Sequence, residues 1–86
     1  MFTLYYYYSQ NCQSCKDYQS TVDKIARELK LDAIYIDIDV GNIIHHIVGI
    51  PTICIDKDAR TIYKSIGNLP YENIIDDIRK EITNDE

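Results

Sequence analysis

Residues 2–15 read FTLYYYYSQNCQSC and join an apolar run to two cysteines three positions apart. The run over residues 2–8 is aromatic and apolar throughout, which is typical of a strand covered on both faces. A helix is disfavoured there because the run is short and ends in polar residues. The stretch therefore predicts a strand followed by a Cys-x-x-Cys pair. Such a pair can close a structural bridge, bind a metal or exchange electrons.

A helical pattern follows, from about residue 11 or 12 to about residue 30. Apolar side chains recur there at steps of three and four, so they share one helix face. They are Cys15, Tyr18, Val22, Ile25, Ala26 and Leu29. Residues 33–38, AIYIDI, predict a second strand, and a short apolar helix is expected over residues 43–48, IIHHIV, ending at Gly49.

The last third predicts a hairpin and a helix. Residues 53–55 and 60–65 favour strands, and the polar residues 56–59 form the short connection that a hairpin needs. Pro70 suits the first turn of a helix, whose buried stripe consists of Ile74, Ile75, Ile78 and Ile82. The order β-α-β-α-β-β-α predicts an α/β fold: a four-stranded mixed sheet flanked by three helices, with helices on both faces.

Composition narrows the possible functions. The chain has 86 residues, which predicts a single domain over residues 1–86. Its net charge of −5, without a basic stripe, disfavours nucleic-acid and anionic-lipid partners. The first ten residues lack signal-peptide features, and no apolar run is long enough for a membrane span. We therefore expect a cytoplasmic location. We also expect a monomer. Three cysteines is an odd number, which disfavours a secreted disulfide framework.

The element order and two motifs together resemble the thioredoxin-fold disulfide oxidoreductases. The motifs are Cys12-Gln13-Ser14-Cys15 after the first strand and Gly49-Ile50-Pro51-Thr52 before the third. The resemblance covers nearly the whole chain, and the length is similar to that of the small glutaredoxin-sized members, including phage and archaeal mini-thioredoxins. Ile50-Pro51-Thr52 looks more like thioredoxin than glutaredoxin.

The resemblance implies several site residues. It implies a cis peptide bond before Pro51, an aromatic residue beside the active site at Tyr8, and the family glycine at Gly67. The chain also departs from the family. Tyr6 stands where thioredoxins place a buried acid, and Ile66-Gly67-Asn68 replaces the paired glycines with which glutaredoxins hold glutathione.

The two cysteines suit redox chemistry. In the first turn of a helix they lie on the same side, with Cα atoms about 5 Å apart, within disulfide reach. Cys12 would lie at the positive helix end, which stabilises a thiolate and makes it the attacking thiol. Cys15, on the apolar face, would be the resolving thiol. Beside them, the backbone of Ile50 could pair with an extended substrate segment.

The leading hypothesis is a thiol–disulfide oxidoreductase that carries electrons as a dithiol, needs no cofactor and reduces protein disulfides. The resemblance suggests ribonucleotide reductase as one client. The electron donor would be a flavoprotein of the thioredoxin reductase type or glutathione, as for a glutaredoxin. Two alternatives are a metal-binding module built on the cysteine pair and a non-catalytic interaction domain.

The remaining candidate ligands favour structural roles. Cys54 lies within a predicted strand and is expected to be a small buried residue. His45 and His46 are adjacent, so on a helix their side chains point about 100° apart and would seldom bind one metal. We expect no metal site, and the histidines are expected to be exposed or partly packed.

Overall fold

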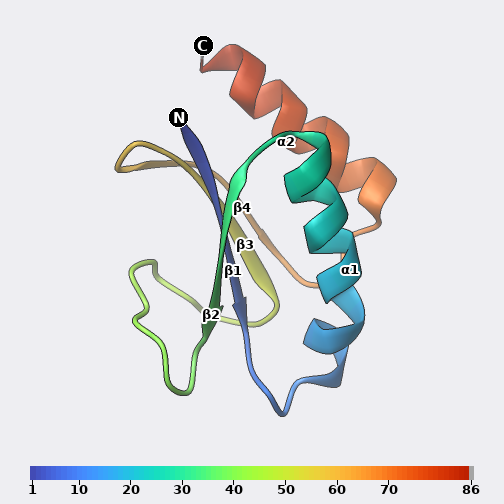
Figure 1. Ribbon diagram of the computed structural model, residues 1–86, viewed down its shortest axis with the longest axis vertical. Helices are drawn as coiled ribbons and strands as arrows, with labels where there is room; N and C mark the ends of the chain where they lie inside the picture. The colour runs from blue at the N-terminus through green and yellow to red at the C-terminus, as the bar shows by residue number, and fades with distance from the viewer. Residues whose placement is uncertain (86) are drawn as a thin grey trace.

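The computed structural model describes residues 1–85, which form one four-stranded sheet and two helices (Figure 1). The strands lie in the order β2-β1-β3-β4. β1 pairs with β2 in parallel, whereas the β1–β3 and β3–β4 pairs are antiparallel. The elements are β1 (Phe2–Tyr8), α1 (Gln13–Glu28), β2 (Asp32–Asp37), β3 (Thr52–Lys57), β4 (Arg60–Ile66) and α2 (Tyr71–Asn84). The four predicted strands and the first and last predicted helices are confirmed within a few residues.

Both helices pack on the same face of the sheet (Figure 1). The core between the helices and the sheet contains apolar residues from both helices and from the sheet. Its fully buried members are Leu4 and Tyr6 of β1, Val22 and Ile25 of α1, Ile53 and Ile55 of β3, and Ile74 and Ile78 of α2. These positions alternate along the strands and recur at helical spacing, which explains why the apolar pattern identified the elements.

The predicted helix over residues 43–48 is wrong. Residues 38–51, here called the proline loop, contain neither helix nor strand and cover the other face of the sheet. The prediction of three helices and of helices on both faces therefore needs correction: the described residues form two helices on one face, opposite the proline loop. An apolar run of six residues rich in β-branched side chains is too short to form a helix without tertiary support.

A buried polar chain holds the proline loop instead. The Tyr7 hydroxyl lies 2.6 Å from His45 Nδ1, and His45 Nε2 lies 3.0 Å from both carboxylate oxygens of Asp56. Thr61 donates a further hydrogen bond to Asp56 at 2.8 Å. The His45 and Asp56 side chains are 8% and 9% exposed. The His45 side chain is thus buried against the loop face of the sheet, and its hydrogen bonds to Tyr7 and Asp56 fix the loop without a helix over residues 43–48.

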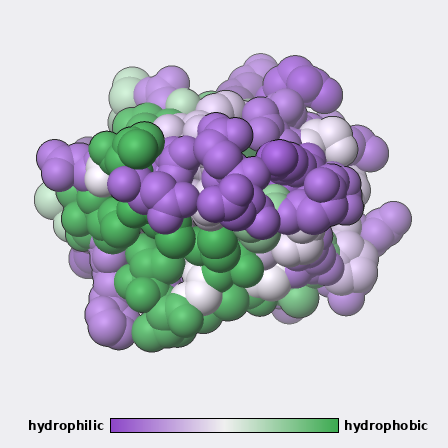
Figure 2. All heavy atoms as spheres, turned by 90° about the horizontal axis from the view of Figure 1, so that it is seen from below, coloured by the Kyte–Doolittle hydropathy of each residue, from purple (hydrophilic) through white to green (hydrophobic). Residues whose placement is uncertain are grey.

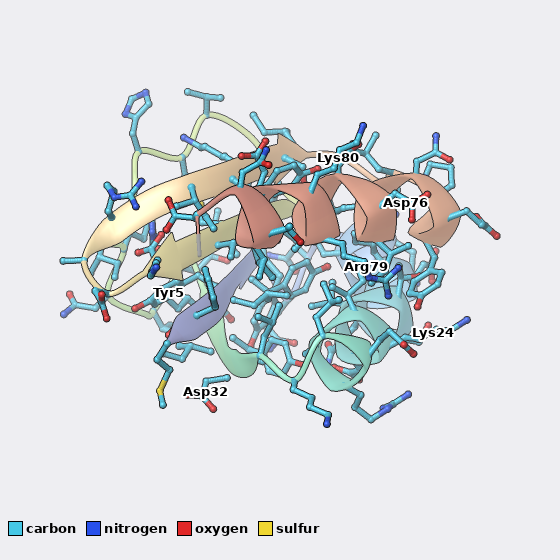
Figure 3. All side chains as sticks on the ribbon, turned by 90° about the horizontal axis from the view of Figure 1, so that it is seen from above. Tyr5, Lys24, Asp32, Asp76, Arg79 and Lys80 are labelled. Carbon is cyan, nitrogen blue, oxygen red and sulfur yellow. A yellow bond between two sulfur atoms is a disulfide. The ribbon has the colours of Figure 1, made fainter. Side chains whose placement is uncertain are left out.

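Charged side chains join the outer surfaces of the two helices. Arg79 of α2 lies 3.9 Å from Glu28 of α1 and 3.8 Å from Asp76 (Figure 3). The Lys24 ammonium of α1 lies 4.1 Å from the ring centre of Tyr71. Such exposed contacts contribute little to stability but are compatible with the shared orientation of the helices. Neither α1 nor α2 is long and apolar enough to cross a membrane.

Candidate active site

Strand register brings the predicted site residues to one end of the sheet. Tyr7 is paired with Thr52, and Thr52 is paired with Ile66. The residues that follow or precede these positions, Tyr8, Pro51 and Gly67, therefore lie at the same sheet edge. The turn from β1 into α1, which carries both cysteines, leaves the sheet at this end (Figure 1).

The turn between β1 and α1 is shaped by Ser9. The Cys12 N–H donates to the Ser9 carbonyl at 3.1 Å, which closes a tight turn. The Ser9 hydroxyl accepts from the Asn11 N–H at 3.3 Å and donates to Asp39 at 2.8 Å. Ser9 is buried, so these bonds fix the turn to the first residues of the proline loop. We refer to residues 9–15 as the dicysteine turn.

Cys12 is the N-cap residue of α1. Its sulfur accepts a hydrogen bond from the Cys15 N–H at 3.1 Å, so it occupies the position where a helix stabilises negative charge. The first turn of α1, which the structure describes in full, carries no acidic side chain that would oppose this charge. The environment therefore favours a thiolate at Cys12 when the pair is reduced.

The cysteines form a disulfide, with Cα atoms 5.2 Å apart. Cys15 is 1% exposed on the buried face of α1, whereas Cys12 is only half-buried. This asymmetry matches the helical periodicity of the sequence: one sulfur is accessible to another molecule, and the second is shielded behind it. The arrangement can accept or release two electrons by closing or opening one bond.

The proline loop ends at the dicysteine side of the sheet. The peptide bond between Ile50 and Pro51 is cis, and Pro51 is buried. Thr52 fixes the turn before it, because its hydroxyl donates to the Gly49 carbonyl at 2.5 Å. The Pro51 carbonyl accepts from the Gly67 N–H at 2.8 Å. Ile50 is half-buried and packs with the cluster on the loop face of the sheet.

Two side chains without a predicted role bind the dicysteine turn. Tyr6 is fully buried, and its hydroxyl donates to the Cys15 carbonyl at 2.6 Å. Burial raises the pKa of Tyr6 above its usual range, so the phenol stays protonated as a donor. Asn68 donates from Nδ2 to the Ser14 carbonyl at 2.9 Å. Both positions were noted only as departures from the family. Successive side chains of a strand point to opposite faces, so Tyr6 and Tyr8 could have been assigned to the same face of the sheet from the sequence. No residue pattern near Asn68 indicates its contact with Ser14.

Tyr8 is half-buried, and its ring stacks on Tyr6 with centroids 6.0 Å apart. Its backbone carbonyl accepts from the Ile38 N–H at 2.8 Å, at the point where the proline loop begins. Tyr8 therefore lies beside the dicysteine turn and connects it to the loop.

Apolar surface covers one side of this end of the molecule. Figure 2 views it from the dicysteine side and shows a broad apolar area beside polar regions. The proline loop contributes exposed Val40, Ile43, Ile44 and Val48, and Ile66 is exposed at the end of β4. Exposed aliphatic side chains in such number are typical of a surface that binds other molecules.

The other candidate ligands lie apart from the cysteine pair. Cys54 is fully buried in β3 on the loop face, and burial raises the pKa of its thiol to about 11. His45 takes part in the buried Tyr7–His45–Asp56 chain, and His46 is exposed. Across residues 1–85, no three His, Cys, Asp or Glu side chains are grouped closely enough to hold a metal ion.

Comparison with known protein families gives a match over most of the chain. The family model described as "Thioredoxin" matches residues 2–80. No curated protein sequence is detectably similar to the chain. Among solved structures, a thioredoxin mutant from Halobacterium salinarum superposes with a TM-score of 0.82 at 19% identity, over 93% of this chain and 74% of that one.

Two further solved structures resemble the chain. Thioredoxin-2 of the malaria parasite, described as a component of its protein secretion machinery, has a TM-score of 0.80 at 18% identity, over 93% of this chain and 82% of that one. Thioredoxin 1 from Thermosipho africanus has a TM-score of 0.75 at 20% identity, over 95% and 98%. At these identities the superpositions show a shared fold.

Proposed function

Because the chain belongs to the thioredoxin family, we propose that it works as a dithiol electron carrier that reduces protein disulfides through Cys12 and Cys15. The observation that carries the proposal is the position of the Cys12 sulfur. It is the N-cap acceptor of α1, accessible to solvent, and bonded to the shielded sulfur of Cys15. A structural bridge would not require one sulfur to be exposed at a helix N-terminus.

The reaction proceeds in two exchanges. The Cys12 thiolate attacks one sulfur of a substrate disulfide, which forms a mixed disulfide and releases the first substrate thiolate. The Cys15 thiolate then attacks the Cys12 sulfur, which releases the second substrate thiolate and closes the Cys12–Cys15 bond. Two electrons have passed to the substrate, whose thiolates take protons from water. An external dithiol or two thiols must then reduce the Cys12–Cys15 disulfide.

The proline loop and the apolar surface support a protein substrate. The backbone of Ile50 precedes the buried Pro51 and offers polar groups to an extended segment. The exposed side chains Val40, Ile44 and Val48 would cover apolar residues of such a segment. A small-molecule disulfide would need neither the backbone groups of Ile50 nor the exposed apolar side chains.

We further propose a flavoprotein of the thioredoxin reductase type as the electron donor, with glutathione as the alternative. Asn68 follows Gly67 where glutaredoxins have a second glycine, and its amide is already bonded to Ser14. This arrangement supports the first donor. We also propose ribonucleotide reductase as a client. A cytoplasmic location and a monomeric state are proposed as well. Turnover with NADPH and thioredoxin reductase, compared with turnover by glutathione and its reductase, distinguishes the donors.

Reduction of insulin by dithiothreitol tests the proposed activity. The native chain is expected to accelerate precipitation of the insulin B chain, and Cys12→Ser is expected to abolish the acceleration. Cys54→Ala is the matched control, because Cys54 is buried on the opposite face of the sheet and should leave the rate unchanged. Equal rates for the native chain and Cys12→Ser would end the proposal.

A further inference from the structure

The segment between β4 and α2 makes hydrogen bonds through three consecutive residues, two of them to the candidate site and the third to Tyr18, a core residue of α1. Each contact is a hydrogen bond of ordinary length. The bonds run from the Gly67 N–H to the Pro51 carbonyl (2.8 Å), from Asn68 Nδ2 to the Ser14 carbonyl (2.9 Å), and from the Tyr18 hydroxyl to the Leu69 carbonyl (2.7 Å). The segment is therefore fixed on both sides of Asn68, which holds the amide of this exposed residue against the dicysteine turn.

Gly67 makes this arrangement possible. Its φ of +96° lies in the region that L-residues rarely adopt, and a Cβ at this position would meet open space. The glycine is therefore required by the backbone conformation and not by crowding. The chain bends at this residue, between the bond to Pro51 and the bond to Ser14.

The Asn68 contact reaches the Cys12 sulfur through a single peptide group. The Ser14 carbonyl that accepts from Asn68 and the Cys15 N–H that donates to Cys12 belong to the same peptide unit. In a trans peptide the C=O and N–H point in opposite directions, so the two hydrogen bonds lie in series. A donor on the carbonyl oxygen polarises the peptide and strengthens the hydrogen bond that its N–H makes.

We propose that Asn68 is a positioning residue that stabilises the Cys12 thiolate through the Ser14–Cys15 peptide. The inference rests on the proposed role of Cys12 as the attacking thiol. In the reduced protein the Cys15 N–H donates to a charged sulfur, and hydrogen bonds to charged groups respond most to such polarisation. Asn68 would thereby increase the fraction of Cys12 that is ready to attack at neutral pH.

The expected size follows from the two bonds. A hydrogen bond to a charged group contributes about 1.5–3 kcal/mol, and an adjoining bond strengthens it by about 10–30%. Loss of the Asn68 donor should therefore lower the acid dissociation constant of Cys12 by a factor of about 1.3 to 5. An aspartate at the same position should have a larger effect, because it presents an acceptor to the Ser14 carbonyl and adds a negative charge near the thiolate.

The test measures alkylation of the reduced protein by iodoacetamide as a function of pH, for the native chain, Asn68→Ala and Asn68→Asp. The midpoint of the pH profile is expected to rise in that order. Asn73→Asp is the control, because it adds the same charge on the exposed surface of α2. The equilibrium with glutathione provides a second readout: both Asn68 variants should favour the disulfide form, because their reduced form has a less stable thiolate.

The outcomes separate this inference from the proposed function. Midpoints of both Asn68 variants that coincide with the native midpoint, or an Asn68→Asp shift no larger than that of Asn73→Asp, would overturn the role of Asn68. Inactivity of the native chain in insulin reduction would overturn the function but not the alkylation result, which needs no substrate. The ordered midpoints, with Asn73→Asp close to native, would support the inference.

Discussion

Removal of the Tyr7 hydroxyl tests whether the buried polar chain holds the proline loop. Because His45 Nε2 faces the Asp56 carboxylate, it carries the proton, and Nδ1 accepts the hydrogen bond from Tyr7 at 2.6 Å. Tyr7→Phe keeps the ring in its fully buried position but leaves Nδ1 without this donor. The variant therefore removes this buried hydrogen bond, together with the longer one (3.4 Å) that the hydroxyl accepts from the Ile44 N–H, and it keeps the aromatic ring in place.

The structure sets the expected magnitude. An unsatisfied buried acceptor costs about 1–3 kcal/mol. A domain of this size has a total free energy of unfolding of about 4–13 kcal/mol, so the loss is a substantial fraction. For small domains each 1 kcal/mol corresponds to about 4–8 °C in Tm. We expect Tyr7→Phe to lower the free energy of unfolding by about 2 kcal/mol and Tm accordingly.

Urea unfolding of the oxidised protein at pH 7, followed by circular dichroism, gives the measurement. Tyr5→Phe is the matched control: its ring also packs against His45, with centroids 4.8 Å apart, but its hydroxyl makes no hydrogen bond to any of residues 1–85. The control should stay within about 0.5 kcal/mol of the native chain. Equal stability of the two variants would refute the conclusion that the Tyr7 bond fixes the loop.

Three further changes probe the site and its surroundings. Tyr6→Phe removes the donor to the Cys15 carbonyl and should cost about 1 kcal/mol in urea unfolding; a cost equal to that of Tyr5→Phe would contradict that bond. Gly67→Ala forces an L-residue to a φ of +96° and should cost about 1–2 kcal/mol by the same assay, and an unchanged stability would contradict it. Burial raises the pKa of Cys54 to about 11 from an ordinary value of 9.0, so the protonated thiol is favoured in the folded state. That contribution is fully present below pH 9 and is lost as pH rises to 11. The difference in free energy of unfolding between the native chain and Cys54→Ala should therefore be constant below pH 9. Between pH 9 and 11 the native chain should lose stability relative to the variant, and a constant difference throughout would count against the raised pKa.

The sequence predicted most of the fold because the core is regular. The helices α1 and α2 bury the apolar face that their spacing indicates, and the apolar runs of β1 and β3 lie in the interior of the sheet. The edge strand β2 is the exception, because its Ile34 and Tyr35 are 44% and 40% exposed. Residues 43–48 mislead because their apolar side chains do not form one buried face. Ile44 and Val48 are 60% and 69% exposed, and the residue that enters the sheet face is the polar His45.

The candidate site was predictable in part. The spacing of Cys12 and Cys15 and their position at a helix start determine their separation of 5.2 Å and their unequal burial. The donors from Tyr6 and Asn68 depend on contacts between residues 9 and 54 positions apart. Such contacts follow from strand register and from the turn at Gly67, which residue patterns alone do not specify.

The proline loop divides the molecule into two pieces of similar length. The dicysteine turn belongs to the piece β1–α1–β2, and Asn68 belongs to the piece β3–β4–α2. Pro51 is the last residue of the loop, directly before β3. The pieces meet along the β1–β3 ladder and between the helices. A cleavage within the loop would therefore yield two fragments, each with an incomplete set of site residues. Thiol exchange on protein substrates would then report reassembly of the fragments, which makes the chain suitable for complementation experiments.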